Sequence, residues 1–220
     1  MDLIIFDLDG TLIDSRQDLV NAVNATRGHA GLASINEGTV SSYVGSGAPV
    51  LVRRVLGSEA SEDQVEEGLE FFLEYYRDHM LDNTVLYPGV AGGLEALLAA
   101  GRQMAVLTNK PVRISKAILE GLGIARHFRQ VYGGNSFDHK KPHPVGIRTL
   151  MAECAVAAER TLMVGDSSVD VLTARNAGVR SCGVTWGFQP ETLFEHPPDI
   201  LVDRMEQICD LALKDGLPFL

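Results

Sequence analysis

Short apolar segments alternate with helical patterns along most of this chain, and that alternation limits the possible folds more than any other feature. Strands are indicated at residues 103–107, 130–132, 161–164, 180–184 and 200–202. Helices are indicated at residues 90–100, 112–122, 144–154, 169–177 and 203–213, and several end at glycine. Because apolar strands alternate with helices, we expect an α/β fold: a Rossmann-like parallel sheet with helices on both faces.

The N-terminus adds one more strand, which runs directly into two carboxylates. Leu3 to Phe6 are apolar, and Asp7 and Asp9 follow them with one residue between. Side chains alternate along a strand, so both acids leave it on the same side. Two carboxylates held close together repel each other unless a cation or a proton intervenes. A polar turn is the simpler interpretation of the same residues.

Residues 15–82 contain no convincing strand pattern. Ser15 with Asp18 resembles a capping box, and Ser61 with Gln64 begins an amphipathic helix. The glycines at 45–47 indicate either a helix break or a substrate loop. We therefore expect two domains: an α/β core of residues 1–14 and 83–220, and an all-helical domain of residues 15–82 inserted into it.

Charge and cysteine content limit the partners and the compartment. The 220 residues carry a formal net charge of −10, which argues against nucleic acid or an anionic membrane as a partner. Cys154, Cys182 and Cys209 lie among apolar neighbours and predict buried, reduced thiols. With neither a basic leader nor an apolar run of membrane-spanning length, we expect an unexported, cytoplasmic protein.

Polar residues follow three of the predicted strands. Asp7 and Asp9 end the first, Thr108, Asn109 and Lys110 follow residues 103–107, and residues 165–170 follow the strand at 161–164. Parallel sheets bind ligands at the carboxyl ends of their strands, where the winding reverses. If the chain crosses to the other side of the first strand after the third, these three ends become neighbours.

Such a group of residues suits phosphoryl transfer. Asp7 and Asp166 offer the oxygen ligands that Mg²⁺ prefers. An ionised Asp can attack phosphorus, and a second Asp can protonate the leaving oxygen and then activate water. Gly10 allows the backbone to turn sharply beside them. Taken singly, Thr108 and Asn109 could equally cap a helix, and Lys141 could be a solvated charge.

The motifs resemble those of haloacid-dehalogenase-superfamily (HAD) phosphatases and stand in the order of that family. They are Asp7-Leu8-Asp9-Gly10-Thr11, Leu107-Thr108-Asn109, Lys141-Pro142 and Gly165-Asp166-Ser167-Ser168-Val169-Asp170. The resemblance implies that Asp7 is the nucleophile and Asp9 the general acid/base. It also implies three further sets: phosphate-binding Thr108, Asn109 and Lys141; Mg²⁺ ligands Asp7, Asp166 and the Asp9 backbone carbonyl; and supporting Gly10 and Asp170. Lys140 adjoins Lys141, which is preferred because it directly precedes Pro142.

The resemblance also implies that the helical insert is a cap over the site. Several segments, among them Asn109-Lys110-Pro111 and Thr185-Trp186-Gly187-Phe188, look most like phosphoglycolate phosphatases. The implied activity is hydrolysis of a small phosphorylated metabolite by a monomer or homodimer. Asp9 separates the chain from relatives that lack this acid, such as the dehalogenases. The alternatives are a phosphatase of another metabolite or of pyrophosphate, a sugar-phosphate mutase, a receiver-like signalling domain and a catalytically silent binding protein.

Overall fold

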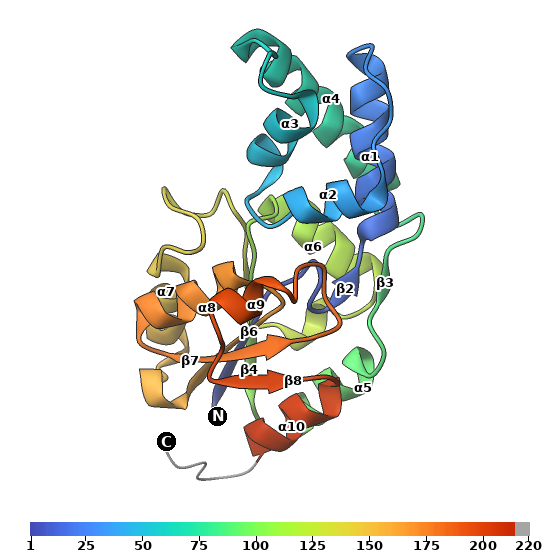
Figure 1. The fold of residues 1–220 in the computed structure, drawn as a ribbon. Coiled ribbons are helices and arrows are strands. Elements are labelled where there is room, and N and C mark those ends of the chain that lie inside the picture. Colours follow the sequence, from blue (N-terminus) through green and yellow to red (C-terminus); the bar gives the residue numbers. More distant parts are fainter. Residues whose placement is uncertain (214–220) are drawn as a thin grey trace.

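A sheet of six parallel strands forms the centre of the computed structural model, which describes residues 1–213 (Figure 1). The strand order is β5-β4-β1-β6-β7-β8. The strands are β1 Leu3–Phe6, β4 Gln103–Leu107, β5 Gln130–Tyr132, β6 Thr161–Gly165, β7 Arg180–Val184 and β8 Ile200–Val202. This confirms the predicted strands to within one residue, and it confirms that the chain crosses to the other side of β1 after β5.

The central strand β1 divides the core between the two faces of the sheet. Leu3 and Ile5 belong to one buried cluster, and Ile4 and Phe6 belong to the other, as strand alternation requires. Helices α7 Val145–Cys154 and α8 Ser168–Ala177 cover the first face. The second face is covered by α5 Val90–Ala99, α6 Val112–Gly121 and α10 Met205–Leu213. The predicted α/β fold with helices on both faces is confirmed.

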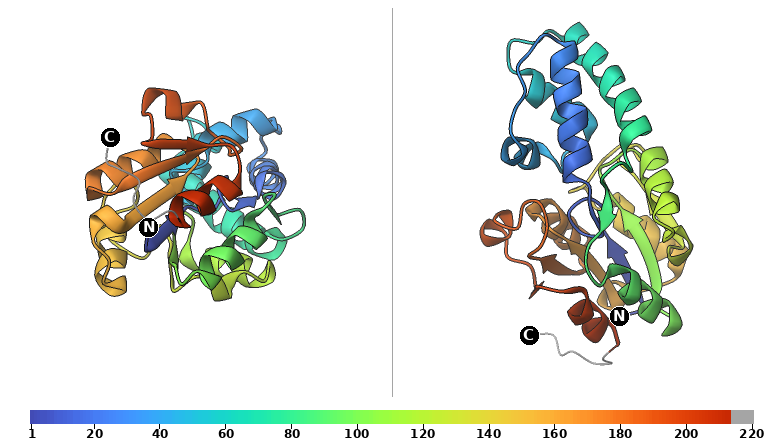
Figure 2. Two further views of the ribbon diagram at one scale, coloured as in Figure 1. Left: turned by 90° about the horizontal axis from the view of Figure 1, so that it is seen from below. Right: turned by 90° about the vertical axis from the view of Figure 1, so that its right-hand side faces the viewer.

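Four helices lie between the first strand and the rest of the sheet and extend away from it (Figure 2, right). They are α1 Arg16–His29, α2 Glu37–Tyr43, α3 Ala48–Leu56 and α4 Glu62–His79; we call residues 16–79 the helical segment. Ser61 and Gln64 form the predicted capping box at the start of α4. A short antiparallel pair, β2 Ile13–Asp14 and β3 Val85–Leu86, joins the two chain crossings and was not predicted. Two residues are too few to show a periodicity.

The start of α1 differs from the sequence prediction. Ser15 precedes α1 without a side-chain capping bond, and its hydroxyl donates instead to Asp9. The carboxylate of Asp18 is fully buried and accepts hydrogen bonds from the backbone and side chains of Asn83 and Thr84. The predicted capping box is therefore wrong here. Asp18 instead ties together the two places where the chain passes between sheet and helical segment.

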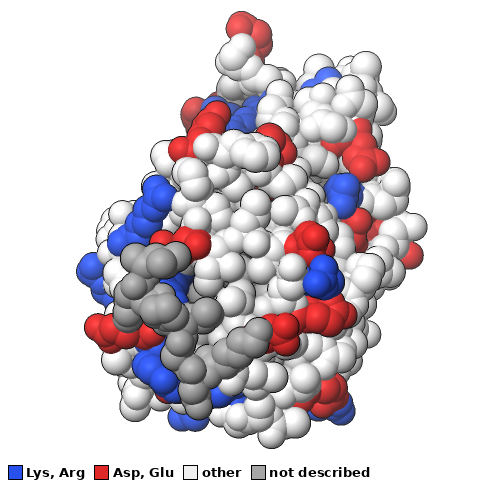
Figure 3. Space-filling model, turned by 60° about the horizontal axis from the view of Figure 1, so that its bottom comes forward, with Lys and Arg blue, Asp and Glu red and all other residues white. Residues whose placement is uncertain are grey.

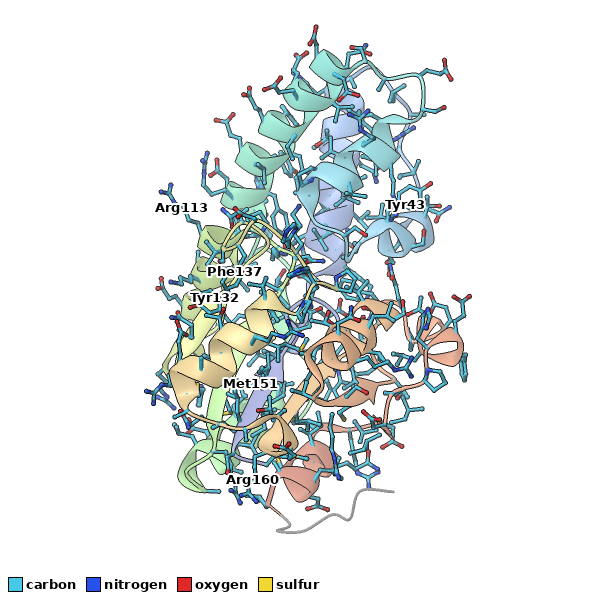
Figure 4. All side chains as sticks on the ribbon, turned by 90° about the vertical axis from the view of Figure 1, so that its left-hand side faces the viewer. Tyr43, Arg113, Tyr132, Phe137, Met151 and Arg160 are labelled. Carbon is cyan, nitrogen blue, oxygen red and sulfur yellow. The ribbon has the colours of Figure 1, made fainter. Side chains whose placement is uncertain are left out.

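Smaller elements complete the fold. These are α9 Thr192–Glu195 and the 3-10 turns η1 Ala125–His127 and η2 Ala158–Arg160, none of which was predicted. Tyr132, at the end of β5, packs against Phe137 of the next loop with ring centroids 4.7 Å apart (Figure 4). Acidic and basic side chains are interspersed around the face shown in Figure 3. Cys154 and Cys182 are buried free thiols, whereas the free thiol of Cys209 is only half-buried. Within residues 1–213, every helix is too short or too polar to cross a bilayer.

Candidate active site

The carboxyl ends of three adjacent strands bring the predicted polar residues to one edge of the sheet. β1 pairs with β4 on one side and with β6 on the other. Asp7 follows β1, Thr108 follows β4 and Asp166 follows β6. Residues about 60 to 160 positions apart in sequence therefore meet at one place, as expected from the strand-end rule.

Asp7, Asp166 and Asp170 form a cluster of three carboxylates, and two of them contact the same ammonium group. One oxygen from each acid lies within 4.8 Å of the others. The Nζ of Lys141 lies 2.9 Å from Asp7 Oδ1 and 2.6 Å from Asp170 Oδ1. The first contact lacks hydrogen-bond geometry, so Asp7 Oδ1 is buried without a hydrogen-bond donor among the described residues. One cation thus contacts two of the three acids, and the cluster holds more acidic than basic groups.

Burial and mutual repulsion raise the proton affinity of two of these acids. Burial raises the pKa of Asp7 to about 6; the charge of Asp170 adds to the rise, and that of Lys141 opposes it. Burial raises the pKa of Asp166 to about 8, with further contributions from Asp170 and Asp7. Hydrogen bonds from the backbone N–H groups of Phe188 and Gln189 oppose this rise and lower the pKa of Asp166. The cluster therefore favours binding of a proton or a cation.

The backbone around the cluster leaves little free space. Gly10 has φ +79°, and a Cβ at this position would overlap the carboxylate of Asp166. Phe188 N–H donates to Asp166 Oδ2 at 2.6 Å from the other side. A buried group of oxygens with one hydrogen-bond-free acceptor and unbalanced negative charge fits a hard divalent cation such as Mg²⁺.

Asp9 lies outside this cluster and has different partners. Both of its carboxylate oxygens accept hydrogen bonds from Lys110 Nζ, at 2.9 and 3.0 Å. The hydroxyl of Ser15 donates to Asp9 Oδ1 at 2.5 Å. Lys110 Nζ also lies 2.8 Å from the phenol oxygen of Tyr76 in α4. The two acids that follow β1 therefore have separate environments.

The remaining predicted residues lie beside the cluster. Thr108 is buried, and its hydroxyl accepts a hydrogen bond from the N–H of Lys110. The carboxamide of Asn109 is engaged at both ends: Nδ2 donates to the carbonyl oxygens of Gly45 and Lys141, and Oδ1 accepts from the N–H of Lys141. Asn109 thus holds the Lys141 backbone. The side chain of Lys140 lies beside Gly47 instead.

A cleft separates this edge of the sheet from the helical segment. The polar group, including Asp7, Asp9, Thr108, Lys141 and Asp166, lines one part of it. Apolar side chains of the helical segment line another part: Leu19, Val44, Ala48, Leu51, Phe72 and Leu73. The cleft accordingly suits a small molecule with one anionic end.

Hydrogen bonds between loops connect the two sides of the cleft. Gln189, on the loop after β7, donates from Nε2 to the carbonyl oxygens of Ser41 and Val44 at 2.8 and 3.0 Å. The glycines at 45–47 separate α2 from α3, which confirms the predicted helix break. They also border the cleft, where Gly45 and Gly47 are lining residues. The segment that separates the two helices therefore also lines the cleft.

The sequence placed Lys110 at a strand end of the site without giving it a role, and it did not identify Tyr76 and Ser15 as site residues. Lys110 follows Thr108 and Asn109 at a strand end, which was the one available signal. Tyr76 occupied an apolar position of a helix, and Ser15 resembled a helix cap. Their grouping around Asp9 depends on residues up to 101 positions apart.

Comparisons with known proteins identify the family of the chain. A family model described as haloacid dehalogenase-like hydrolase matches residues 4–184. A phosphoglycolate phosphatase of Vibrio parahaemolyticus is 41% identical over 217 residues, covering 96% of this chain and 95% of that protein. The phosphoglycolate phosphatase of Colwellia psychrerythraea is 37% identical and covers 97% of each chain. A crystal structure from Haemophilus somnus, described as a predicted phosphoglycolate phosphatase, has a TM-score of 0.91 and 33% identity, covering 96% of this chain and 97% of its own.

Proposed function

The chain belongs to the haloacid dehalogenase-like hydrolases, and on that premise we propose that it is a magnesium-dependent phosphoglycolate phosphatase that works through an aspartyl-phosphate. One observation carries the mechanism: two acids follow the same strand but have separate surroundings. Asp7 lies in the cluster with Lys141, whereas Asp9 lies beside it, in contact with Lys110 and the cleft. Different surroundings suit different tasks.

In the first step, a carboxylate oxygen of Asp7 attacks phosphorus as the bond to the leaving oxygen breaks. That oxygen keeps the bonding electron pair and takes the proton carried by Asp9. In the second step, the Asp9 carboxylate removes a proton from water, and the water oxygen attacks phosphorus. The bond to Asp7 then breaks, which releases inorganic phosphate and restores both acids.

Other residues of the cluster hold the phosphoryl group and the cation. Lys141 and the hydroxyl of Thr108 would bind phosphoryl oxygens, and Asn109 would hold the Lys141 backbone in place. Asp7, Asp166 and the backbone carbonyl of Asp9 would hold Mg²⁺, with Asp170 and Gly10 in support. When bound, Mg²⁺ neutralises charge that develops on the transferred group.

We further propose that residues 15–82 act as a cap domain on a core of residues 1–14 and 83–220. The cleft between them suits selection of a small substrate by the helical segment. The three free cysteines favour a reducing, cytoplasmic location. A monomer or a homodimer would serve this function equally, since the polar residues of the cleft come from one chain.

A substrate panel tests the proposal. Phosphate release is measured with 2-phosphoglycolate, other phosphorylated metabolites and pyrophosphate, with and without Mg²⁺, and sugar phosphates are also checked for isomerisation. We expect the highest kcat/KM with 2-phosphoglycolate, strict dependence on Mg²⁺, and loss of activity in Asp7→Asn. Equal activity of Asp7→Asn and the wild type contradicts the assignment of the nucleophile. Preference for another ester, or isomerisation without release, contradicts the proposed substrate.

A further inference from the structure

Lys110 is a buried cation that the mechanism above does not use. It follows β4, and its side chain is 5% exposed. Its Nζ donates to both oxygens of Asp9, at 2.9 and 3.0 Å, and to the phenol oxygen of Tyr76, at 2.8 Å. An ammonium group has three donors, and these three contacts use all of them. The donors of Lys110 are therefore engaged by protein groups in the structure.

The second hydrogen-bond partner of Lys110, Tyr76, belongs to the helical segment. Tyr76 lies near the end of α4, is 1% exposed, and stacks on Phe72 with ring centroids 5.7 Å apart. Lys110 Nζ also lies 4.5 Å from the Tyr76 ring centroid, close enough for a cation–π interaction. The position of α4 thus determines where the Tyr76 phenol lies relative to the Lys110 ammonium group.

Asp9 accepts one further hydrogen bond, and its donor lies at the edge of the helical segment. Ser15 immediately precedes α1, which packs against α4, and its hydroxyl donates to Asp9 Oδ1. The Asp9 side chain is 12% exposed and lines the cleft. Both sets of contacts that orient this carboxyl group consequently depend on how the helical segment sits on the sheet.

We propose that Lys110 is a positioning residue that links the position of α4 relative to the sheet, through Tyr76, to the orientation of the Asp9 carboxyl group. This inference rests on the proposed function, in which Asp9 protonates the leaving oxygen. An alkyl alcohol needs that proton in order to leave, whereas a nitrophenol leaves readily without it. Misplacing Asp9 should therefore slow the cleavage of alkyl phosphates much more than that of aryl phosphates.

The test compares kcat/KM for 2-phosphoglycolate and for 4-nitrophenyl phosphate, because kcat/KM reports the steps up to departure of the leaving group. In Lys110→Met we expect a fall of about 10²-fold for the alkyl ester and less than about 3-fold for the aryl ester. Tyr76→Phe keeps the ring and should lower only the alkyl value, by roughly 3–10-fold. Adding Tyr76→Phe to Lys110→Met should cost nothing more, because the two residues act in one chain of contacts.

Two further variants separate positioning from general damage. Lys110→Arg keeps a cation that can contact both Asp9 oxygens, and it should recover part of the alkyl activity. Lys116→Met, on the exposed side of α6, is the matched control and should leave both values unchanged. An equal fall for both esters in Lys110→Met means that Lys110 binds phosphate or supports the fold, and it overturns the inference. Unchanged values for both esters also overturn it. A wild-type protein that cleaves neither ester contradicts the proposed function instead.

Discussion

The side-chain amide of Asn109 lies 2.8 Å from the carbonyl oxygen of Gly45. Asn109 follows a strand of the sheet, whereas Gly45 belongs to the helical segment, so this hydrogen bond crosses the cleft. The same carboxamide also exchanges two hydrogen bonds with the backbone of Lys141, at 3.0 and 3.1 Å. One side chain therefore joins the helical segment to the loop that carries the buried ammonium group.

We expect Asn109→Ala to lower kcat/KM for 4-nitrophenyl phosphate by roughly 10–100-fold. The N–H of Lys141 loses its acceptor, which costs about 1–3 kcal/mol, and the ammonium group is less well placed. Steady-state kinetics measures the effect, and Asn21→Ala in α1 serves as the control. An unchanged kcat/KM contradicts a role for Asn109 in placing Lys141.

Asp9→Asn should keep Mg²⁺ binding and lose turnover. The substitution leaves the backbone carbonyl in place and removes the group that carries the proton, so kcat should fall by about 10²–10⁴-fold. Calorimetric titration with Mg²⁺ and steady-state kinetics measure the two properties separately. Asp138→Asn, on an exposed loop, is the control. Normal turnover in Asp9→Asn would mean that another group handles the proton.

Without Mg²⁺, the stability of the protein should decline as the pH rises. The pKa values of Asp7 and Asp166 are raised from 3.8 to about 6 and about 8 in the folded protein. A raised pKa contributes stability that is complete below the unfolded value and is lost as the pH rises through the folded value. We expect the Mg²⁺-induced increase in Tm to grow between about pH 5 and about pH 8.

Asp166→Asn isolates the larger of these shifts. At about pH 8 without Mg²⁺, the variant should unfold roughly 2–8 °C above the wild type, because a buried charge is gone. The difference should shrink toward about pH 5, where Asp166 is protonated in the folded wild type. Asp138→Asn again provides the control. A metal-free wild type whose Tm rises across this range is incompatible with the cluster as described.

Asp18→Ala should destabilise the protein without touching the cleft. It leaves four donors of Asn83 and Thr84 without their acceptor. We expect a loss of about 2–4 kcal/mol and a fall in Tm of about 5–15 °C. Thermal unfolding measures it, with Asp138→Ala as the control. A Tm equal to that of the control would show that Asp18 does not tie the chain crossings together.

The regular elements followed from sequence because their signals are local. Strand β4 was predicted at its observed bounds, since four of its five residues are apolar and the strand lies between a helix-ending glycine and a polar loop. Elements that are too short to repeat a pattern were missed. The pair β2–β3 and helix α9 have two and four residues per element, and they form through contacts with distant parts of the chain.

The sequence by itself determined which residues gather at the edge of the sheet. Asp7, Thr108 and Asp166 each follow a strand, and parallel strands place their carboxyl ends together whatever the loops do. Only the tertiary structure decided how these groups pair. Lys110 and Lys141 have similar side chains, yet one faces Asp9 and Tyr76 while the other faces Asp7 and Asp170. That division depends on how α4 lies over the sheet edge, and no spacing along the chain encodes contact between residues 34 to 101 positions apart.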